Sequence, residues 1–303
     1  MRKKENLAAY MAEVICQLEV EGRLGTAHVY QSTLKRILDF SRGAPPCFSD
    51  VTTRWLKSFQ RYLLGRNLQW NTVSTYMRML RAVYFRAVDA GKAPYHPRLF
   101  KGVYTGTRVT VKRAVDEVTL HRLSAECLPS NDCLDKTRML FLLLFMLRGI
   151  PFVDIAYLRK CDLRGDTILY RRRKTGTQLV VKVEPEAMDL IEQLRNKDEH
   201  SLYLFPFLNA TGAEAYRQYQ NALRRFNACL KRLCMQTGIG VSLSSYSARH
   251  SWATIANYRN YQCELICNAM GHSSVKVTET YLKPHTDERI GQMNMDIISY
   301  VFS

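Results

Sequence analysis

The sequence has 303 residues, 47% of them hydrophobic, and its 44 lysines and arginines outnumber 27 acidic residues to give a formal net charge of +17. A hydrophobic fraction this large excludes a disordered basic tail. The length of the chain favours two domains. A small domain stays soluble with a net charge of roughly 2–8, so this larger excess favours a polyanionic partner, with nucleic acid ahead of a membrane.

The first part of the chain, residues 5–91, predicts four helices, because its apolar residues recur at helical spacing between capping and turn residues. The fourth of these helices carries three arginines beside its apolar face. These arginines either form a solvated face or contact phosphates, and the sequence leaves both interpretations open. The expected helices cover 7–21, 26–41, from Asp50 or Thr52 to 65, and 73–90, and the arginines are Arg78, Arg81 and Arg86.

A linker is predicted over residues 92–112, which hold two prolines and two glycines without a helical period. Asp116 can cap a helix to about residue 126, and Asp132 or Asp135 can begin the next. That second helix contains the apolar run 139–147 and must be buried, because it is apolar on every side. Arg148 follows directly, either as a snorkelling helix end or as a charge held in a pocket.

Residues 166–183 predict a β-hairpin with Gly176 in its turn and a basic tip at 171–174. Helices are predicted over 185–196 and 214–236. One hairpin among so many helices indicates a mainly α fold.

The stretch from Tyr246 to Tyr281 predicts three short helices joined by tight turns. Ser245 or Ser247 can cap the first, the second stops at Gly271, and the third, starting at Ser273 or Ser274, is expected to carry Tyr281. Three chemically useful side chains, Arg249, His272 and Tyr281, would then lie at or near helix ends and could converge on one pocket.

These residues resemble a known motif set. Arg249-His250 on a helix, then Gly271-His272, then a tyrosine nine residues after the histidine, are similar to the end of the catalytic domain of tyrosine recombinases, the phage integrase family. The sequence around Arg249 resembles that of the branch of this family common in Bacteroides and their mobile elements. The resemblance covers nearly the whole chain. It implies a helical, SAM-like core-binding domain over 1–105 and a mostly helical catalytic domain over 106–303 with a small antiparallel β-hairpin sheet.

The resemblance also implies a reaction that needs neither ATP nor a metal. Arg148 and Arg249 would clamp the non-bridging oxygens of a DNA phosphate, since the guanidinium fork matches them. His272 would donate a further hydrogen bond, Lys174 would protonate the leaving 5′ oxygen, and Tyr281 would form a 3′-phosphotyrosyl link.

Five further positions receive more modest roles. Tyr246 stands where most family members have a histidine, and an ordinary phenol pKa of about 10 makes it a positional residue rather than a base. Asp154, after an apparent three-residue insertion, would hold the arginine or the helix in place. His250 should face about 100° away from Arg249 on their helix and is interpreted as structural. Besides the three arginines of the fourth helix, Arg171 and Arg173 are the expected DNA contacts.

The implied protein is a site-specific recombinase acting on double-stranded DNA with inverted-repeat half-sites, as a homotetramer on two duplexes. The apolar segment after Pro284 either folds back or docks on a neighbouring protomer, as in related recombinases, and we predict docking. No cofactor, metal or membrane partner is expected, and the place of action would be the bacterial cytoplasm at the nucleoid. The nine scattered cysteines favour buried thiols over a metal site at Cys263, Cys267 and His272.

Three alternatives remain. A relaxing activity like that of type IB topoisomerases uses the same chemistry. A catalytically inactive DNA-binding regulator could keep the same fold, an alternative that the unusual Tyr246 sustains. A basic helical scaffold for RNA would leave the ordered motif set unexplained.

Overall fold

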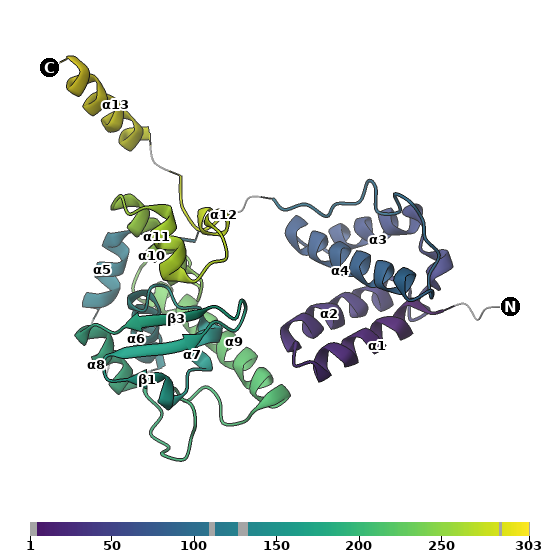
Figure 1. The fold of residues 1–303 in the computed structure, drawn as a ribbon, viewed down its shortest axis with the longest axis horizontal. Helices are drawn as coiled ribbons and strands as arrows, with labels where there is room; N and C mark the ends of the chain where they lie inside the picture. Colours follow the sequence, from purple (N-terminus) through teal and green to yellow (C-terminus); the bar gives the residue numbers. More distant parts are fainter. Residues whose placement is uncertain (1–4, 109–112, 127–132, 285–286, 303) are drawn as a thin grey trace. The chain divides into compact units, whose positions relative to one another are not determined.

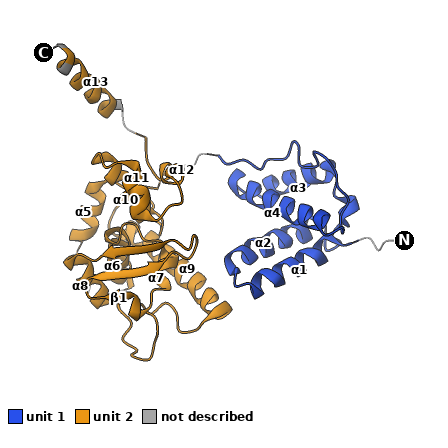
Figure 2. Cartoon of the chain, viewed as in Figure 1, with its two compact units in different colours: residues 1–110 blue, residues 111–303 orange. Residues whose placement is uncertain are grey.

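The computed structural model describes residues 5–108, 113–126, 133–284 and 287–302 (Figure 1). The chain divides into two compact units, residues 1–110 and residues 111–303 (Figure 2). Each unit has its own apolar core.

The first unit consists of the four predicted helices and one short 3-10 turn, η1 (Phe48–Asp50). Thr52 caps the third helix, because its side chain accepts a hydrogen bond from the Trp55 backbone. The fourth helix begins at Trp70, ahead of its expected cap, with Gln69 as the N-cap residue. The Trp70 ring packs on that of Tyr104, with 5.0 Å between the ring centres. The helices are α1 (Leu7–Val20), α2 (Leu24–Phe40), α3 (Thr53–Gly65) and α4 (Trp70–Asp89).

Helix α4 is two-sided. Val73, Met77, Leu80 and Tyr84 recur at helical spacing and are fully buried in the core of this unit. The three arginines predicted on this helix lie on its exposed side. The burial of one face therefore leaves the other face basic.

The second unit is built around α6 (Cys133–Met146), which runs through its middle (Figure 1). Phe141, Leu143 and Leu144 are completely buried, which confirms the prediction of a helix that is apolar on all sides. The surrounding helices include α5 (Glu117–Ala125), α8 (Pro185–Leu194), α9 (Gly212–Gln236) and α10 (Ser247–Tyr258). After α6 the chain turns sharply at Arg148 and Gly149, whose φ angles are 57° and 66°.

A three-stranded antiparallel sheet in the order β1-β2-β3 stands beside these helices. The predicted hairpin consists of β2 (Thr167–Arg171) and β3 (Gln178–Lys182), with Leu169 opposite Val180. Three elements were not predicted, because each is too short to show a period: α7 (Phe152–Ala156), η2 (Lys160–Asp162) and β1 (Leu163–Arg164).

The last part of the unit contains α11 (Cys263–Met270), α12 (Val275–Glu279) and α13 (Asp287–Phe302). Two expectations about this part were wrong. Helix α12 does not carry Tyr281, which follows its end in a turn where the Tyr281 backbone N–H donates to Thr278 O at 2.8 Å. The N-cap of α10 is Tyr246, not a serine, because Ser247 is already helical and its hydroxyl accepts from Ser244 N at 3.0 Å.

Across the described ranges, we find no helix with both the length and the apolar character that crossing a lipid bilayer requires.

We predict that Gly149→Ala lowers the free energy of unfolding much more than Gly165→Ala. Both glycines have positive φ, so each alanine should cost about 1–2 kcal/mol of backbone strain. A Cβ at Gly165 would meet open space, whereas one at Gly149 would lie 2.7 Å from the Arg249 Cα. Overpacking should add about 1–3 kcal/mol at Gly149. Urea unfolding of the two variants measures the difference, and equal losses would contradict the close approach.

Candidate active site

Arg249, in the first turn of α10, is only 2% exposed. Its Nη1 donates to Gly149 O and its Nη2 to Met270 O, both at 2.7 Å. Within the described part of the chain its Nε has no hydrogen-bond partner. Burial lowers the pKa of this guanidinium, and the nearby charge of Arg172 lowers it further. A buried cation with an unused donor is well suited to bind an anion.

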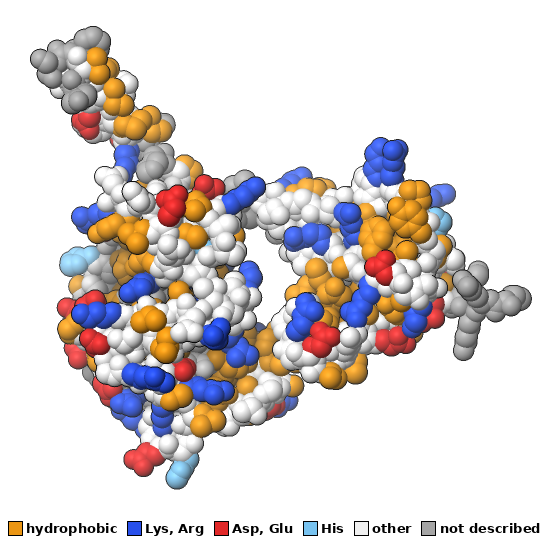
Figure 3. All heavy atoms as spheres, in the orientation of Figure 1, with side chains coloured by type: hydrophobic (Ala, Val, Ile, Leu, Met, Phe, Trp, Pro, Cys, Tyr) orange, Lys and Arg blue, Asp and Glu red, His pale blue; other side chains and the backbone are white. Residues whose placement is uncertain are grey.

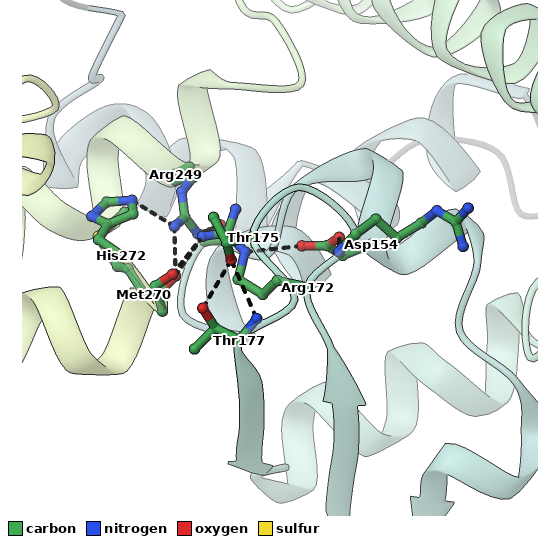
Figure 4. A network of polar contacts seen from close by, with 10 residues as sticks. Asp154, Arg172, Thr175, Thr177, Arg249, Met270 and His272 are labelled. Carbon is green, nitrogen blue, oxygen red and sulfur yellow. Dashed lines mark hydrogen bonds and ion pairs between the residues drawn. The ribbon is translucent and has the colours of Figure 1, made fainter. Parts of the chain in front are cut away.

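Arg172 supplies a second buried guanidinium, 6% exposed, although the sequence analysis gave it no role. Its Nη1 donates to Met270 O at 2.9 Å and to Gly271 O at 3.1 Å, and its Nε pairs with Asp154 at 3.2 Å. The two arginines therefore meet at one carbonyl oxygen (Figure 4).

The inward direction of Arg172 follows from strand geometry. Side chains alternate between the two faces of a strand, and Ile168 and Tyr170 on β2 are buried while Arg171 is exposed. Arg172 continues the buried face one step beyond the strand. This alternation was the signal in the sequence that could have identified it.

Asp154 joins α7 to the hairpin. Its Oδ1 accepts from the Arg173 backbone N–H at 2.9 Å, and its Oδ2 pairs with Arg172. Burial raises the pKa of this carboxyl, although the Arg173 N–H and the Arg172 charge oppose the rise. The structure thus places Asp154 where it can hold an arginine, although that arginine is Arg172.

The C-terminal end of α11 provides the carbonyl groups on which the arginines converge. The last carbonyls of a helix lack partners within the helix and carry partial negative charge. Here Gly271 ends α11 in the left-handed conformation with φ 63°, and a Cβ at this position would lie 2.9 Å from Arg172 Cδ. Glycine therefore favours both the left-handed turn and the approach of Arg172.

His272 lies directly after this turn. Its Nε2 is 2.8 Å from Arg249 Nη2 and its Nδ1 is 2.9 Å from Thr278 Oγ1. Because a guanidinium can only donate, Nε2 accepts, and in the neutral ring the proton lies on Nδ1 and is donated to Thr278. Burial, with the nearby charges of Arg249, Arg172 and Lys174, lowers the pKa of His272 to about 3.

Tyr281 completes the group. Its ring lies 4.9 Å from that of His272 and 4.7 Å from that of His250, with the guanidinium of Arg249 5.5 Å from its centre. The neighbouring Tyr246 is 42% exposed, yet desolvation by its surroundings raises the pKa of its hydroxyl, with a further contribution from Tyr281. A raised pKa makes Tyr246 a still weaker base.

The remaining candidates of this unit lie at different places. Lys174 is exposed at the hairpin tip, close enough for its charge to lower the pKa of His272. The Arg148 side chain is directed instead toward β3, where its Nη1 donates to Val180 O at 3.3 Å. The structure thus brings together Arg249, His272, Tyr281, Asp154 and Tyr246, with Lys174 nearby, and does not bring Arg148 into the network around Met270.

The arginines predicted to contact DNA differ in the contacts that they make within the protein. Arg173 lies 3.7 Å above the ring of Tyr157, and Arg171 donates to Gly176 O at 3.3 Å. In the first unit, Arg78 is exposed, Arg81 lies 5.7 Å from the ring of Phe85, and Arg86 bonds to Gln17. On the face drawn in Figure 3, lysine and arginine side chains are spread over both units.

Among the described residues, no three or more histidine, cysteine, aspartate or glutamate side chains are grouped so that they could hold a metal ion. Cys267 Sγ contacts His272 O at 3.7 Å, rather than the imidazole.

Two family models match most of the chain. Residues 6–102 match the family described as the Phage integrase SAM-like domain, and residues 113–288 match the Phage integrase family. A search of curated proteins by sequence gave no match.

Solved structures with the same fold are distant in sequence. The Tn1549 transposon integrase in complex with transposon right end DNA has 14% identity and a TM-score of 0.67, covering 97% of this chain and 99% of its own. A lambda integrase dimer bound to a core site has 14% identity and a TM-score of 0.64, with coverage of 90% and 94%. A lambda integrase tetramer bound to a Holliday junction has 14% identity and a TM-score of 0.62, with coverage of 94% and 80%.

We predict that His272 makes the protein less stable as the pH falls. Between its ordinary pKa of 6.5 and its folded pKa of about 3, the unfolded chain binds a proton at His272 that the folded chain does not. The free energy of unfolding should therefore fall as the pH falls through this window. In His272→Asn the slope of this free energy against pH should be smaller, by an amount that corresponds to the uptake of up to about one proton on unfolding. Urea unfolding from pH 7.5 to 5 measures the slopes, with the exposed His200→Asn as control. A slope in His272→Asn equal to that of the unchanged protein would contradict the assignment.

Proposed function

The chain belongs to the phage integrase family of tyrosine-type site-specific DNA recombinases, and we propose that the candidate active site cleaves and rejoins DNA strands through a 3′-phosphotyrosyl intermediate. The observation that carries this proposal is the meeting of two buried guanidinium groups beside a tyrosine ring. Such an arrangement offers positive charge to a phosphate next to a nucleophile.

Arg249 and Arg172 are assigned to the non-bridging oxygens of the phosphate. Arg249 has an unused Nε donor, and the burial of both groups strengthens their electrostatic effect on a pentacoordinate transition state. Asp154 holds Arg172 in position and offsets part of the charge. Arg148 remains the alternative second clamp, since it was the arginine predicted from the motif.

His272 approaches the same place through its Nε2. A bound DNA phosphodiester, which is a monoanion, would accept hydrogen bonds where Nε2 now accepts one from Arg249, so the histidine must carry a proton on Nε2 to donate. The negative charge of the phosphate favours this protonation, because opposite charges raise the pKa of an imidazole.

Tyr281 is the proposed nucleophile. Its phenolic oxygen loses its proton to solvent and attacks phosphorus, the bond to the 5′ oxygen breaks, and Lys174 at the exposed hairpin tip gives that oxygen a proton. A 5′-hydroxyl from another strand reverses the step, and the bond energy is kept in the phosphotyrosyl link. Tyr246, with its raised pKa, is assigned a positional role at the phosphate.

The presence of arginine, lysine, histidine and tyrosine in one neighbourhood favours an active recombinase over an inactive DNA-binding regulator. Double-stranded DNA with inverted half-sites is the proposed substrate, and the cytoplasm at the nucleoid is the proposed place of action. For the first unit we propose a core-binding role, with phosphate contacts from α4, because its three arginines lie on the exposed side of that helix.

A tetramer on two duplexes is the proposed working form. Helix α13 supports this, because it exposes a set of large apolar side chains that a neighbouring protomer could cover. These side chains, each about half exposed or more, are Ile290, Met293, Met295, Ile297, Ile298 and Val301.

We predict that Tyr281→Phe abolishes a covalent protein–DNA adduct. Incubating the protein with nicked duplexes taken from the DNA that flanks its own gene traps the cleaved state, because the released end diffuses away. A denaturing gel should show the adduct in the unchanged protein and none in Tyr281→Phe, with the exposed Tyr261→Phe as the matched control. Binding without an adduct on several sites would instead support the inactive regulator.

We further predict that Arg172 matters more than Arg148. Loss of one transition-state donor lowers a rate by about 10²–10³-fold, so Arg172→Ala should do so while Arg148→Ala loses less than about tenfold. The rate of adduct formation at saturating DNA measures both.

Since Arg172→Ala also leaves Asp154 unpaired, Arg172→Lys serves as a second variant. This variant keeps a positive charge beside Asp154, so the protein should stay folded. It lacks the guanidinium fork, so the rate of adduct formation should remain low. The reverse ranking, with Arg148→Ala the slower enzyme, would return the second clamp to Arg148.

A further inference from the structure

His250 contacts the nucleophile segment in two ways. Its Nδ1 lies 3.1 Å from the main-chain oxygen of Tyr281, and its ring centre lies 4.7 Å from that of the Tyr281 side chain, at an angle of 36°. A carbonyl oxygen can only accept, so Nδ1 carries the proton and donates it. A purely structural role for this histidine does not explain why it meets both the backbone and the ring of the nucleophile.

Thr254, one helical turn further along α10, reinforces this contact. Its hydroxyl donates to the same Tyr281 oxygen at 3.4 Å and accepts from Lys283 N at 3.3 Å. Thr254 is 3% exposed. Residues four apart lie on the same face of a helix, so His250 and Thr254 together attach the backbone of residues 281–283 to α10.

The same helix carries Arg249, whose side chain reaches Met270 and His272. Adjacent residues of α10 thus make different contacts, since Arg249 reaches the Met270 carbonyl and His272, and His250 reaches the backbone of Tyr281. The turn that holds Tyr281 lies just after α12, which ends at Glu279, and it is closed by the backbone hydrogen bond from Tyr281 N–H to Thr278 O. Its orientation depends on contacts from α10 and from the ring of His272.

We propose that His250 is a positioning residue for Tyr281, a role that rests on the proposed recombinase function. The Nδ1–H bond fixes the backbone of Tyr281, and the imidazole ring limits the rotation of the phenol, so the nucleophile is held beside the guanidinium of Arg249. The alignment of the reacting atoms strongly affects the rate, because a displacement of about 1 Å can lower a rate by about 10²-fold.

The test is the rate constant of adduct formation on the nicked duplex at saturating DNA, together with the Kd for DNA and the urea unfolding curve. His250→Ala should slow adduct formation by about 10²-fold with the Kd nearly unchanged. His250→Asn places an amide N–H near the position of Nδ1 but lacks the ring, so it should recover part of the rate. His250→Gln places its amide near Nε2 and should remain slow.

Two results would overturn the proposal. The first is adduct formation by His250→Ala at the rate of the unchanged protein. The second is equal slowing and equal destabilisation of the asparagine and glutamine variants, as a merely structural role requires. Failure of the unchanged protein to form any adduct would instead count against the recombinase function itself. The two failures are therefore distinguishable in one experiment.

A sulfur substitution in the DNA separates positioning from acid catalysis. When the bridging 5′ oxygen is replaced by sulfur, the leaving group needs no proton, so Lys174→Ala should recover its rate and His250→Ala should not. Recovery of His250→Ala on this substrate would show that His250 acts on the leaving group, and the positioning role would be wrong.

Discussion

Two positively charged guanidinium groups are buried at one carbonyl oxygen, that of Met270, and the architecture of the second unit depends on making this arrangement stable. Like charges repel strongly where water is excluded. The protein offsets the repulsion with the partial negative charge at the end of α11, with the carbonyl of Gly149, and with the carboxylate of Asp154. The hairpin, α10, α11 and the turn after α6 are therefore held together by the same few polar contacts (Figure 4).

Close approach of the backbone makes these contacts possible. Gly149 lies against the Cα of Arg249, and Gly271 lies against the side chains of Arg172 and Leu179, at distances where a Cβ would collide. Both glycines also have positive φ. Each glycine thus adopts the left-handed turn and lets a neighbouring element come close. The convergence of the two arginines is favoured by glycine at both positions.

The same arrangement explains how the site is ready for an anion. Most acceptors around the two arginines are neutral carbonyl oxygens, and Asp154 supplies the nearby carboxylate. His272 stays neutral because burial and its cationic neighbours lower its pKa to about 3. The two guanidinium groups are oriented before substrate arrives, so in the proposed reaction the main rearrangement is the protonation of His272 Nε2.

By itself, the sequence determined the mainly helical fold, the buried helix before Arg148, the hairpin, and the spacing that singled out Arg249, His272 and Tyr281. These features depend on local periodicity and on turn residues, which a single chain displays directly. Even the buried position of Arg172 could have been read from the alternation along β2. Only the tertiary structure decided that Arg172 rather than Arg148 meets Arg249, and that His250 faces Tyr281. Those outcomes depend on backbone turns and on packing between residues far apart in the chain, such as Gly149 against Arg249, and no local pattern reports the direction in which such side chains point.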